Sequence, residues 1–347
     1  MTLHQRLASA REQLVRAGIN PTEAAIDVDV YARAILGWDR ARILLNYHEP
    51  VPDTLEPKFS EWIARRERFE PTAYILGKRE FWGLDFAVSP AVLIPRPETE
   101  LVVEEAVARA AGSSGQPPRI ADIGTGSGNI AVAVAYQRQD CSMVATDVSR
   151  DALGVARDNA VRHGVADRID FVCASYLDGV DGPFDLITAN PPYVREIDRR
   201  GLSADVLQEP AVALFGGENG LLHLDGVLAT TETQLRSGGW LIMEFGFGQE
   251  DDVRALVARR AGLTMHGTRA DLALERAFRM KPEVIFFVSD GEPTDLSTDE
   301  ILQQVEIAQK TLSRPIVINV VAYRASGGEK FMRELAEKNS GIFREVK

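Results

Sequence analysis

Short apolar runs alternate with amphipathic stretches between residues 119 and 280, and this alternation limits the fold more than any other feature of the chain. The apolar runs have the length of buried strands, whereas the stretches between them carry apolar residues at the three- and four-residue spacing of helices. Such alternation predicts an α/β fold with a doubly wound, mainly parallel sheet and helices on both faces. We expect strands at 119–123, 141–147, 169–174, 184–189 and 240–245, and helices at 129–137, 150–163, 221–235 and 250–261.

The pattern changes three times along the chain and predicts four domains. We expect a helical domain at residues 1–75, a β-hairpin with a linker helix at 76–118, the alternating domain at 119–280 and a partial α/β segment at 281–347. In the helical domain, Pro21 is placed to start a helix, and Gly18 and Gly37 are placed to end one. The expected helices lie at 2–17, 21–36 and 54–68.

The hairpin and the C-terminal segment are predicted from shorter patterns. Two strand-like runs, 79–82 and 85–89, lie on either side of Gly83, and a stiff proline-containing loop then leads into a helix at 101–111. In the C-terminal segment we expect strands at 284–289, 316–321 and 341–346, and helices at 298–312 and 328–339.

Composition and charge disfavour several classes of protein. The 347 residues are 45% hydrophobic and 26% charged, the balance of a globular protein. No apolar run approaches the roughly 18–20 residues of a membrane helix, and no secretory signal is recognised, so we expect a cytoplasmic protein without a membrane partner. Cys141 and Cys173 are too few for a disulfide framework or a zinc site, and we expect both thiols to be buried. A net charge of −12 disfavours direct nucleic-acid binding, because such surfaces are usually basic.

A glycine-rich loop follows the first expected strand of the alternating domain. Asp122 precedes the run Gly124-Thr125-Gly126-Ser127-Gly128, and Asp147 ends the next strand. Glycines allow a tight turn and the close approach of a ligand. A carboxylate at the end of the next strand, here Asp147, can accept both hydroxyls of a ribose. The spacing differs from the Gly-x-Gly-x-x-Gly of pyrophosphate binders. Acidic groups suit S-adenosylmethionine, which has no phosphate and carries a cationic sulfonium; a tight turn without a ligand is the alternative.

The tetrad Asn190-Pro191-Pro192-Tyr193 follows the fourth expected strand. Two prolines fix their φ angles and remove two backbone donors, and a residue before proline is pushed toward an extended conformation. The result is a rigid loop that presents two acceptors, the Asn190 side-chain oxygen and the Pro191 carbonyl. Such a loop suits a substrate –NH₂ group that donates two hydrogen bonds.

Methyl transfer to a planar amide or amine nitrogen fits this loop. An amide nitrogen shares its lone pair with the carbonyl group and is a poor nucleophile. Hydrogen bonds from its protons to fixed acceptors hold it in line with the methyl sulfonium and favour positive charge on the nitrogen. Tyr193 offers its π-face to the substrate or to the nascent cation. We therefore expect Asn190, Pro191 and Tyr193 to be catalytic.

Together these motifs resemble the release-factor glutamine N5-methyltransferases, the HemK/PrmC proteins. The resemblance covers residues 1–280, and its specific pieces are Phe81-Trp82-Gly83, the Ile-Pro-Arg-Pro-Glu-Thr-Glu run at 94–100, residues 122–128, the tetrad, and the Glu-Phe-Gly-Phe-Gly-Gln run at 244–249. The tetrad is shared with adenine-N6 DNA methyltransferases, whereas the run at 94–100 and the helical domain point to the protein-glutamine branch. The resemblance implies a Rossmann-like S-adenosylmethionine methyltransferase sheet at 119–280.

The resemblance also implies a substrate and residue roles. The substrate is the glutamine in the Gly-Gly-Gln loop of a peptide chain release factor, which the helical domain would dock. The loop at 124–128 would hold the methionine part and ribose of the cofactor, and Asp147 would bind the ribose hydroxyls. Tyr176 stands where the family often has a tryptophan beside the adenine, and Asn190 would touch the cofactor as well. The implied glutamine pocket consists of Asn190, Pro191, Pro192 and Tyr193.

The C-terminal segment resembles the second half of a von Willebrand factor A domain. The resemblance is carried by Phe287-Val288-Ser289-Asp290-Gly291 and by Ile318-Asn319-Val320-Val321-Ala322. In that family the aspartate equivalent to Asp290 helps to hold a divalent metal, but the primary Asp-x-Ser-x-Ser motif is missing here. Because a hard cation needs several oxygen ligands, we expect no metal site.

Three alternative functions stay open. An adenine-N6 nucleic-acid methyltransferase would share the tetrad but should carry a basic, aromatic-rich region that holds a flipped base, and none is found. A glutamine of a ribosomal protein is a close variant of the substrate. A non-catalytic adhesion or scaffold protein would act through the C-terminal segment, but the intact cofactor residues argue against it.

Overall fold

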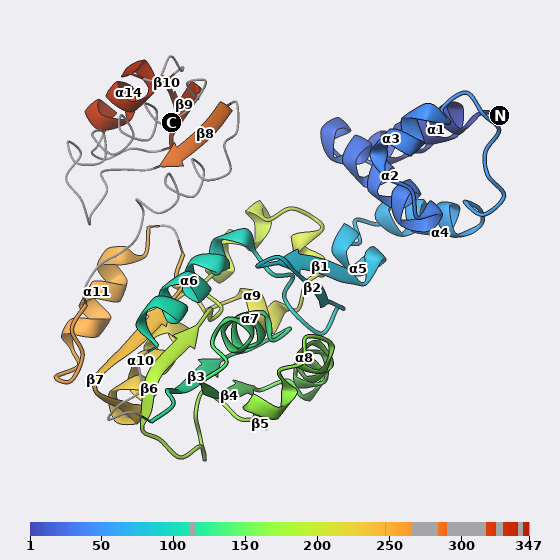
Figure 1. The fold of residues 1–347 in the computed structure, drawn as a ribbon. Coiled ribbons are helices and arrows are strands. Elements are labelled where there is room, and N and C mark those ends of the chain that lie inside the picture. The colour runs from blue at the N-terminus through green and yellow to red at the C-terminus, as the bar shows by residue number, and fades with distance from the viewer. Residues whose placement is uncertain are drawn as a thin grey trace. The chain divides into compact units, whose positions relative to one another are not determined.

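The computed structural model describes residues 1–110, 116–246, 248–265, 284–289, 317–323, 329–338 and 343–346. The chain forms two units, Met1–Phe245 and Gly246–Lys347 (Figure 1). Within the described ranges, no helix is both long and apolar enough to cross a membrane.

Helices occupy the N-terminal part of the first unit. They are α1 (Leu3–Arg16), α2 (Pro21–Leu36), α3 (Arg40–Leu45), α4 (Lys58–Arg66) and α5 (Thr72–Leu76). The side chain of Thr2 accepts a hydrogen bond from the Gln5 N–H and caps α1, and Asn20 caps α2 in the same way through Thr22. Gly37 ends α2 in the left-handed conformation at φ 65°. The apolar faces of the helices pack into one core that contains Tyr31, Phe59 and Trp62.

The expected helix at 54–68 was wrong at its start, and two short helices were not expected. The helix begins at Lys58, directly after Pro57. Proline has no N–H and fits the start of a helix but not its interior, which explains the late start. The missed helices α3 and α5 have six and five residues, too few to show a periodic pattern.

The predicted hairpin is confirmed. Strand β1 (Lys78–Phe81) pairs antiparallel with β2 (Leu84–Ala87). Its two-residue turn has positive φ at both positions, 57° at Trp82 and 71° at Gly83, the geometry that matches the twist of paired strands. The following loop contains the short 3₁₀ helix η1 (Pro97–Thr99) and leads into α6 (Glu100–Arg109).

The alternating region forms the predicted doubly wound sheet. Its five strands run parallel in the order β5-β4-β3-β6-β7. They are β3 (Arg119–Ile123), β4 (Ser142–Asp147), β5 (Ile169–Cys173), β6 (Phe184–Ala189) and β7 (Leu235–Met243), and the helices between them include α7 (Asn129–Gln137), α8 (Arg150–Arg162), α9 (Ala211–Leu214) and α10 (Leu222–Gln234). The strand order switches direction between β3 and β6, so the loops after these two strands lie at the position where such sheets bind ligands.

Alternate residues of the central strands enter two different cores. Ile120 and Leu186 pack with residues of α6 and α7 on one face, whereas Ala121 and Ile187 pack with Val227 of α10 on the other. A strand places successive side chains on opposite faces, and both faces are covered here. The sheet is therefore a rigid platform for the loops at its carboxyl edge.

Two expectations at the margins of the sheet were wrong. Strand β7 begins at Leu235 rather than at residue 240, because the glycines Gly238 and Gly239 interrupt the apolar run although the backbone pairing with β6 continues across a register shift. Cys173 is exposed, since β5 is an edge strand and the side chain stands at its end, whereas Cys141 is buried as expected.

The second unit contains α11 (Glu250–Ala258) and, further on, β8 (Val284–Ser289), β9 (Val317–Tyr323), α14 (Glu329–Lys338) and β10 (Phe343–Val346). The three strands are parallel in the order β10-β9-β8. The predicted strands of this segment are confirmed, and the expected helix at 298–312 lies outside the described residues. The resemblance to a von Willebrand factor A domain and the four domain boundaries stay predictions.

Candidate active site

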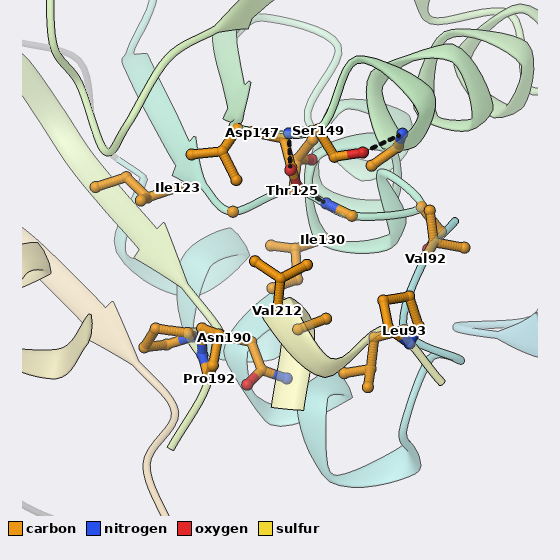
Figure 2. Close-up of a pocket in the computed structure, with 18 of the residues that line it drawn as sticks. Val92, Leu93, Ile123, Thr125, Ile130, Asp147, Ser149, Asn190, Pro192 and Val212 are labelled. Atoms are coloured by element: carbon orange, nitrogen blue, oxygen red, sulfur yellow. Dashed lines mark hydrogen bonds between the residues drawn. The ribbon is translucent and has the colours of Figure 1, made fainter. Parts of the chain in front are cut away.

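A cavity lies over the carboxyl ends of the central strands. Its wall is formed by the glycine loop after β3, the end of β4 and the tetrad after β6. Figure 2 shows Asp147 and Ser149 on one side of the cavity and Asn190 and Pro192 on the other. The cavity brings together nine of the residues singled out in the sequence: Gly124, Thr125, Gly126, Ser127, Asp147, Tyr176, Asn190, Pro191 and Pro192.

The glycine loop turns sharply at three positions. Gly124, Gly126 and Gly128 have φ angles of 70°, 56° and 79°, a region that side chains other than glycine rarely adopt. Gly128 does not line the cavity but directly precedes α7 as its N-cap, where a Cβ atom would lie 3.1 Å from the Cβ of Ala156 in α8. Gly128 therefore lets two helices approach, while Gly124 and Gly126 leave the cavity side open.

The carboxylate of Asp147 is held by two backbone groups. One oxygen accepts a hydrogen bond from the Gly126 N–H at 2.9 Å, and the other accepts from the Ser149 N–H at 2.8 Å (Figure 2). Each oxygen has a second lone pair that these bonds leave available. A fixed, cavity-lining carboxylate of this kind can accept two hydroxyl groups from a bound ligand.

A second carboxyl group, that of Asp122, lies fully buried under the loop. One of its oxygens accepts a hydrogen bond of 2.8 Å from the Thr188 hydroxyl. Burial, joined by the charge of Asp147, raises the pKa of Asp122 to about 6, although the hydroxyls of Thr125 and Thr188 oppose the shift. At neutral pH this carboxyl adds negative charge beneath the cavity, which suits a cationic ligand.

Tyr176 lines the cavity in a constrained position. Its φ of 50° is unusual for a tyrosine, and its hydroxyl lies 3.2 Å from the Nδ1 of His223 in α10. A Cβ atom at Gly226 would lie 2.2 Å from the tyrosine ring, so glycine at that position makes room for the aromatic side chain. His223 also lines the cavity, and burial lowers its pKa. A flat aromatic face is thus held at the cavity wall.

The tetrad is tied to one carboxylate at the end of β7. The Asn190 Nδ2 donates a hydrogen bond of 2.9 Å to the Thr99 hydroxyl oxygen, and the Thr99 hydroxyl donates one of 2.7 Å to Glu244. The other oxygen of Glu244 accepts a 3.0 Å hydrogen bond from the Tyr193 hydroxyl. Burial raises the pKa of Glu244, and the charge of Glu98 adds to this, while the donor groups of Thr99, Tyr193 and the nearby Asn190 oppose it.

A second cavity adjoins the first at the tetrad. Asn190, Pro191 and Pro192 line both cavities, whereas Tyr193 lines only the second among the described residues. The tetrad therefore stands between two spaces, one bounded by the glycine loop and one bounded by the chain that follows the tetrad. This arrangement can hold two ligands with their reacting atoms close together.

The proline-containing loop is fastened by Glu209. This carboxylate is 2% exposed, lies 2.5 Å from the Arg96 guanidinium and accepts a hydrogen bond of 2.9 Å from the Ile94 N–H. The same loop carries Thr99, which accepts the hydrogen bond from Asn190. The ion pair therefore supports the tetrad indirectly, through Thr99.

Residues 5–77 match the family described as PrmC N-terminal domain, and residues 99–223 match the family described as Methyltransferase small domain. The chain is 39% identical over 274 residues to the release factor glutamine methyltransferase of Bradyrhizobium diazoefficiens, which covers 78% of this chain and 89% of that relative. The corresponding protein of Nitratidesulfovibrio vulgaris is 40% identical over 276 residues, covering 78% and 92%. The chain belongs to the release factor glutamine methyltransferase family. The family predicted from the motifs is thereby confirmed.

Among solved structures, the ribosomal protein L11 methylase of Lactobacillus delbrueckii subsp. bulgaricus is 24% identical to this family member. The match covers 50% of this chain and 76% of that one, with a TM-score of 0.35.

Four residues of this release factor glutamine methyltransferase site were not assigned a role from the sequence: Thr99, Glu209, His223 and Glu244. The runs at 94–100 and 244–249 were noted for their resemblance to the family, but no pattern in them pairs Thr99 with Glu244 across 145 positions. Only the folded chain brings these side chains together.

Proposed function

We propose that the chain transfers a methyl group from S-adenosylmethionine to the side-chain nitrogen of the glutamine in the Gly-Gly-Gln loop of peptide chain release factors. The main structural support is that the acceptor-bearing residues Asn190 and Pro191 stand between two adjoining cavities. Family membership at 39–40% identity supports the glutamine substrate over an adenine base.

The first cavity fits S-adenosylmethionine. The open side of the glycine loop at Gly124 and Gly126 accommodates the methionine part, the oriented Asp147 carboxylate suits the ribose hydroxyls, and the Tyr176 ring suits the adenine. Two buried or fixed carboxyl groups, Asp122 and Asp147, compensate a cationic sulfonium. When bound there, the cofactor supplies an electrophilic methyl group. In this proposal the cofactor contacts are Gly124, Thr125, Gly126, Ser127, Asp147, Tyr176 and Asn190. Gly128, expected among them, would act indirectly by letting α7 and α8 pack closely behind the loop.

The second cavity would receive the glutamine side chain. Asn190 Oδ1 and the Pro191 carbonyl accept the two N–H bonds of its amide, and Pro192 and Tyr193 line the pocket. These acceptors hold the amide nitrogen with its face toward the first cavity, which lowers the entropic part of the barrier. They also favour the positive charge that develops on the nitrogen as it gains the methyl group, before it releases one of its two protons.

The helical segment at residues 1–75 would dock the release factor. In support, the buried Arg66 of α4 lies 3.8 Å from Asp205, which follows the tetrad, so the helices contact the chain beside the proposed glutamine pocket. The net charge of −12 disfavours direct nucleic-acid binding. A substrate from the translation machinery places the proposed reaction in the cytoplasm.

The test is incubation of the full chain with methyl-labelled S-adenosylmethionine and purified release factor. We expect label in the wild-type factor and none in a factor whose Gly-Gly-Gln glutamine is replaced by alanine. Label that persists in the altered factor would exclude this glutamine as the target. The variant Asn190→Ala serves as the enzyme control and should lose turnover by about two orders of magnitude or more while it keeps its fold. A ribosomal protein tested in parallel checks the closest alternative substrate.

A further inference from the structure

Glu244 stands beside the tetrad without a role in the mechanism above. It follows β7 directly, and its backbone N–H donates a hydrogen bond of 3.0 Å to the carbonyl of Ala189, the residue before Asn190. Its two carboxylate oxygens bind Thr99 and Tyr193, one residue on each side of the acceptor site. We propose that Glu244 is a positioning residue that fixes, through Thr99, which end of the Asn190 amide faces the substrate.

The directions of the hydrogen bonds carry the proposal. An ionised carboxylate can only accept, so the hydroxyls of Thr99 and Tyr193 both donate to Glu244. The single hydroxyl hydrogen of Thr99 is then used, and the Thr99 oxygen can only accept. The Asn190 atom that lies 2.9 Å from this oxygen must therefore be the hydrogen-bearing Nδ2. The orientation of the amide follows from the chain of donors and is not a free choice.

The orientation leaves the Asn190 oxygen available for the substrate. Among the described residues, no donor is paired with Asn190 Oδ1, and Asn190 lines both cavities. A substrate –NH₂ group needs an acceptor. An Asn190 amide turned by half a rotation would present its own –NH₂, and two donors would then face each other. This step rests on the proposed function, because it assumes that Asn190 binds a substrate amide.

The surroundings of the network make it selective. Thr99 is 1% exposed, so solvent does not set the direction of its hydroxyl. Tyr193 holds the second oxygen of Glu244 and thereby fixes the rotation of the carboxylate itself. A partly buried donor chain with both ends occupied has one satisfied arrangement, and a change of donor to acceptor at any point disturbs all of it.

The experiment compares three variants of the full chain with the wild type, using labelled S-adenosylmethionine and release factor. Glu244→Gln keeps the size of the side chain but places an –NH₂ donor in the network. Thr99→Val keeps the shape but removes the hydroxyl, and Thr99→Ser keeps the hydroxyl. We expect kcat to fall on the order of 10²-fold in Glu244→Gln and Thr99→Val. In both, KM for the release factor and Kd for the cofactor should change by less than about threefold, and Thr99→Ser should stay near the wild-type rate.

Several outcomes would overturn the proposal. A Glu244→Gln enzyme within about threefold of the wild-type kcat would remove the role of Glu244, and wild-type methylation in the same series would leave the proposed function standing. If Glu244→Gln does not fold, the threonine pair decides. Equal rates in Thr99→Val and Thr99→Ser would reject the hydroxyl relay, and an active serine beside an inactive valine would support it. A wild-type chain that does not methylate the release factor would instead reject the proposed function, and this inference with it.

Discussion

Asp147 and Gly126 are joined by a 2.9 Å hydrogen bond in which the backbone N–H of the glycine loop donates to the carboxylate at the end of the neighbouring strand. The side chain that is proposed to bind the ribose therefore also holds the loop that is proposed to hold the methionine part. A single substitution at Asp147 should disturb both contacts.

Asp147→Asn should weaken cofactor binding without unfolding the chain. The amide is neutral and has one acceptor oxygen where the carboxylate has two. One backbone N–H and one proposed ribose contact therefore lose their acceptor, and the remaining contacts lose a charged one. We expect Kd for S-adenosylmethionine to rise by about 10- to 100-fold in titration calorimetry. Asp151→Asn is the matched control because Asp151 is exposed in the first turn of α8. Equal affinities for the two variants would contradict the assigned role of Asp147.

Two glycine-to-alanine changes should have opposite effects on stability. At Gly128 the backbone has φ 79°, and a new Cβ would meet Ala156 at 3.1 Å, so the variant should lose about 2 kcal/mol of unfolding free energy or more. At Gly154, inside α8, no atom of the described residues outside its own helical turn lies within 4 Å of the new Cβ, and better helix propensity should add about 0.5–1 kcal/mol. Thermal unfolding of the full chain checks both. A Gly128→Ala protein as stable as the wild type would show that α7 and α8 are not packed at this distance.

Glu209→Ala should loosen the loop that carries Thr99. The change leaves the Ile94 N–H and the Arg96 guanidinium without their partner in a site where the carboxylate is 2% exposed. Removing one member of such a pair costs about 3 kcal/mol and should appear as faster amide hydrogen exchange in the peptide that contains Ile94. Glu218→Ala, at an exposed glutamate, is the control and should leave this exchange unchanged. Unaltered protection at Ile94 in Glu209→Ala would contradict the hydrogen bond between the Ile94 N–H and Glu209.

The turnover rate should fall as the pH is lowered, because Glu244 becomes protonated. The groups that face this carboxyl are Glu98, Thr99, Tyr193 and Asn190, and its pKa lies above the ordinary value of 4.5. Below that pKa the protonated carboxyl becomes a donor and can reverse the Thr99 hydroxyl, whereas above it the carboxylate accepts. Activity should therefore be present above the raised pKa and lost as the pH falls through it.

Single-turnover rates from about pH 5 to about pH 8, at saturating cofactor, measure this acid limb. The acid limb should disappear in Glu244→Gln, because this slower variant has no carboxyl group at position 244 to protonate. It should move to lower pH in Glu98→Gln, because the neighbouring negative charge is removed. Identical pH profiles for the wild type and Glu244→Gln would show that another group causes the limb.

Much of the fold and part of the site could be predicted because the signals are local. The bounds of β3, α7 and β6 match their expected ranges to the residue, since each is marked by its own apolar run and turn residues. The glycine loop and the tetrad each follow a strand, and the carboxyl ends of parallel strands meet at one edge, so their proximity followed from topology. Short helices and the glycine-interrupted start of β7 were missed because they show no such period.

The amino-acid sequence by itself determined the parallel sheet, the place of the glycine loop and the stiffness of the Asn-Pro-Pro-Tyr loop, because periodicity, proline and glycine act on the residues next to them. Only the tertiary structure decided which groups hold that loop. Thr99 contacts Glu244 across 145 positions and Arg96 contacts Glu209 across 113. Neither contact can be recognised from the spacing of residues in the sequence. Such pairs depend on strand register and on how loops pack at the sheet edge, which are properties of the whole folded unit.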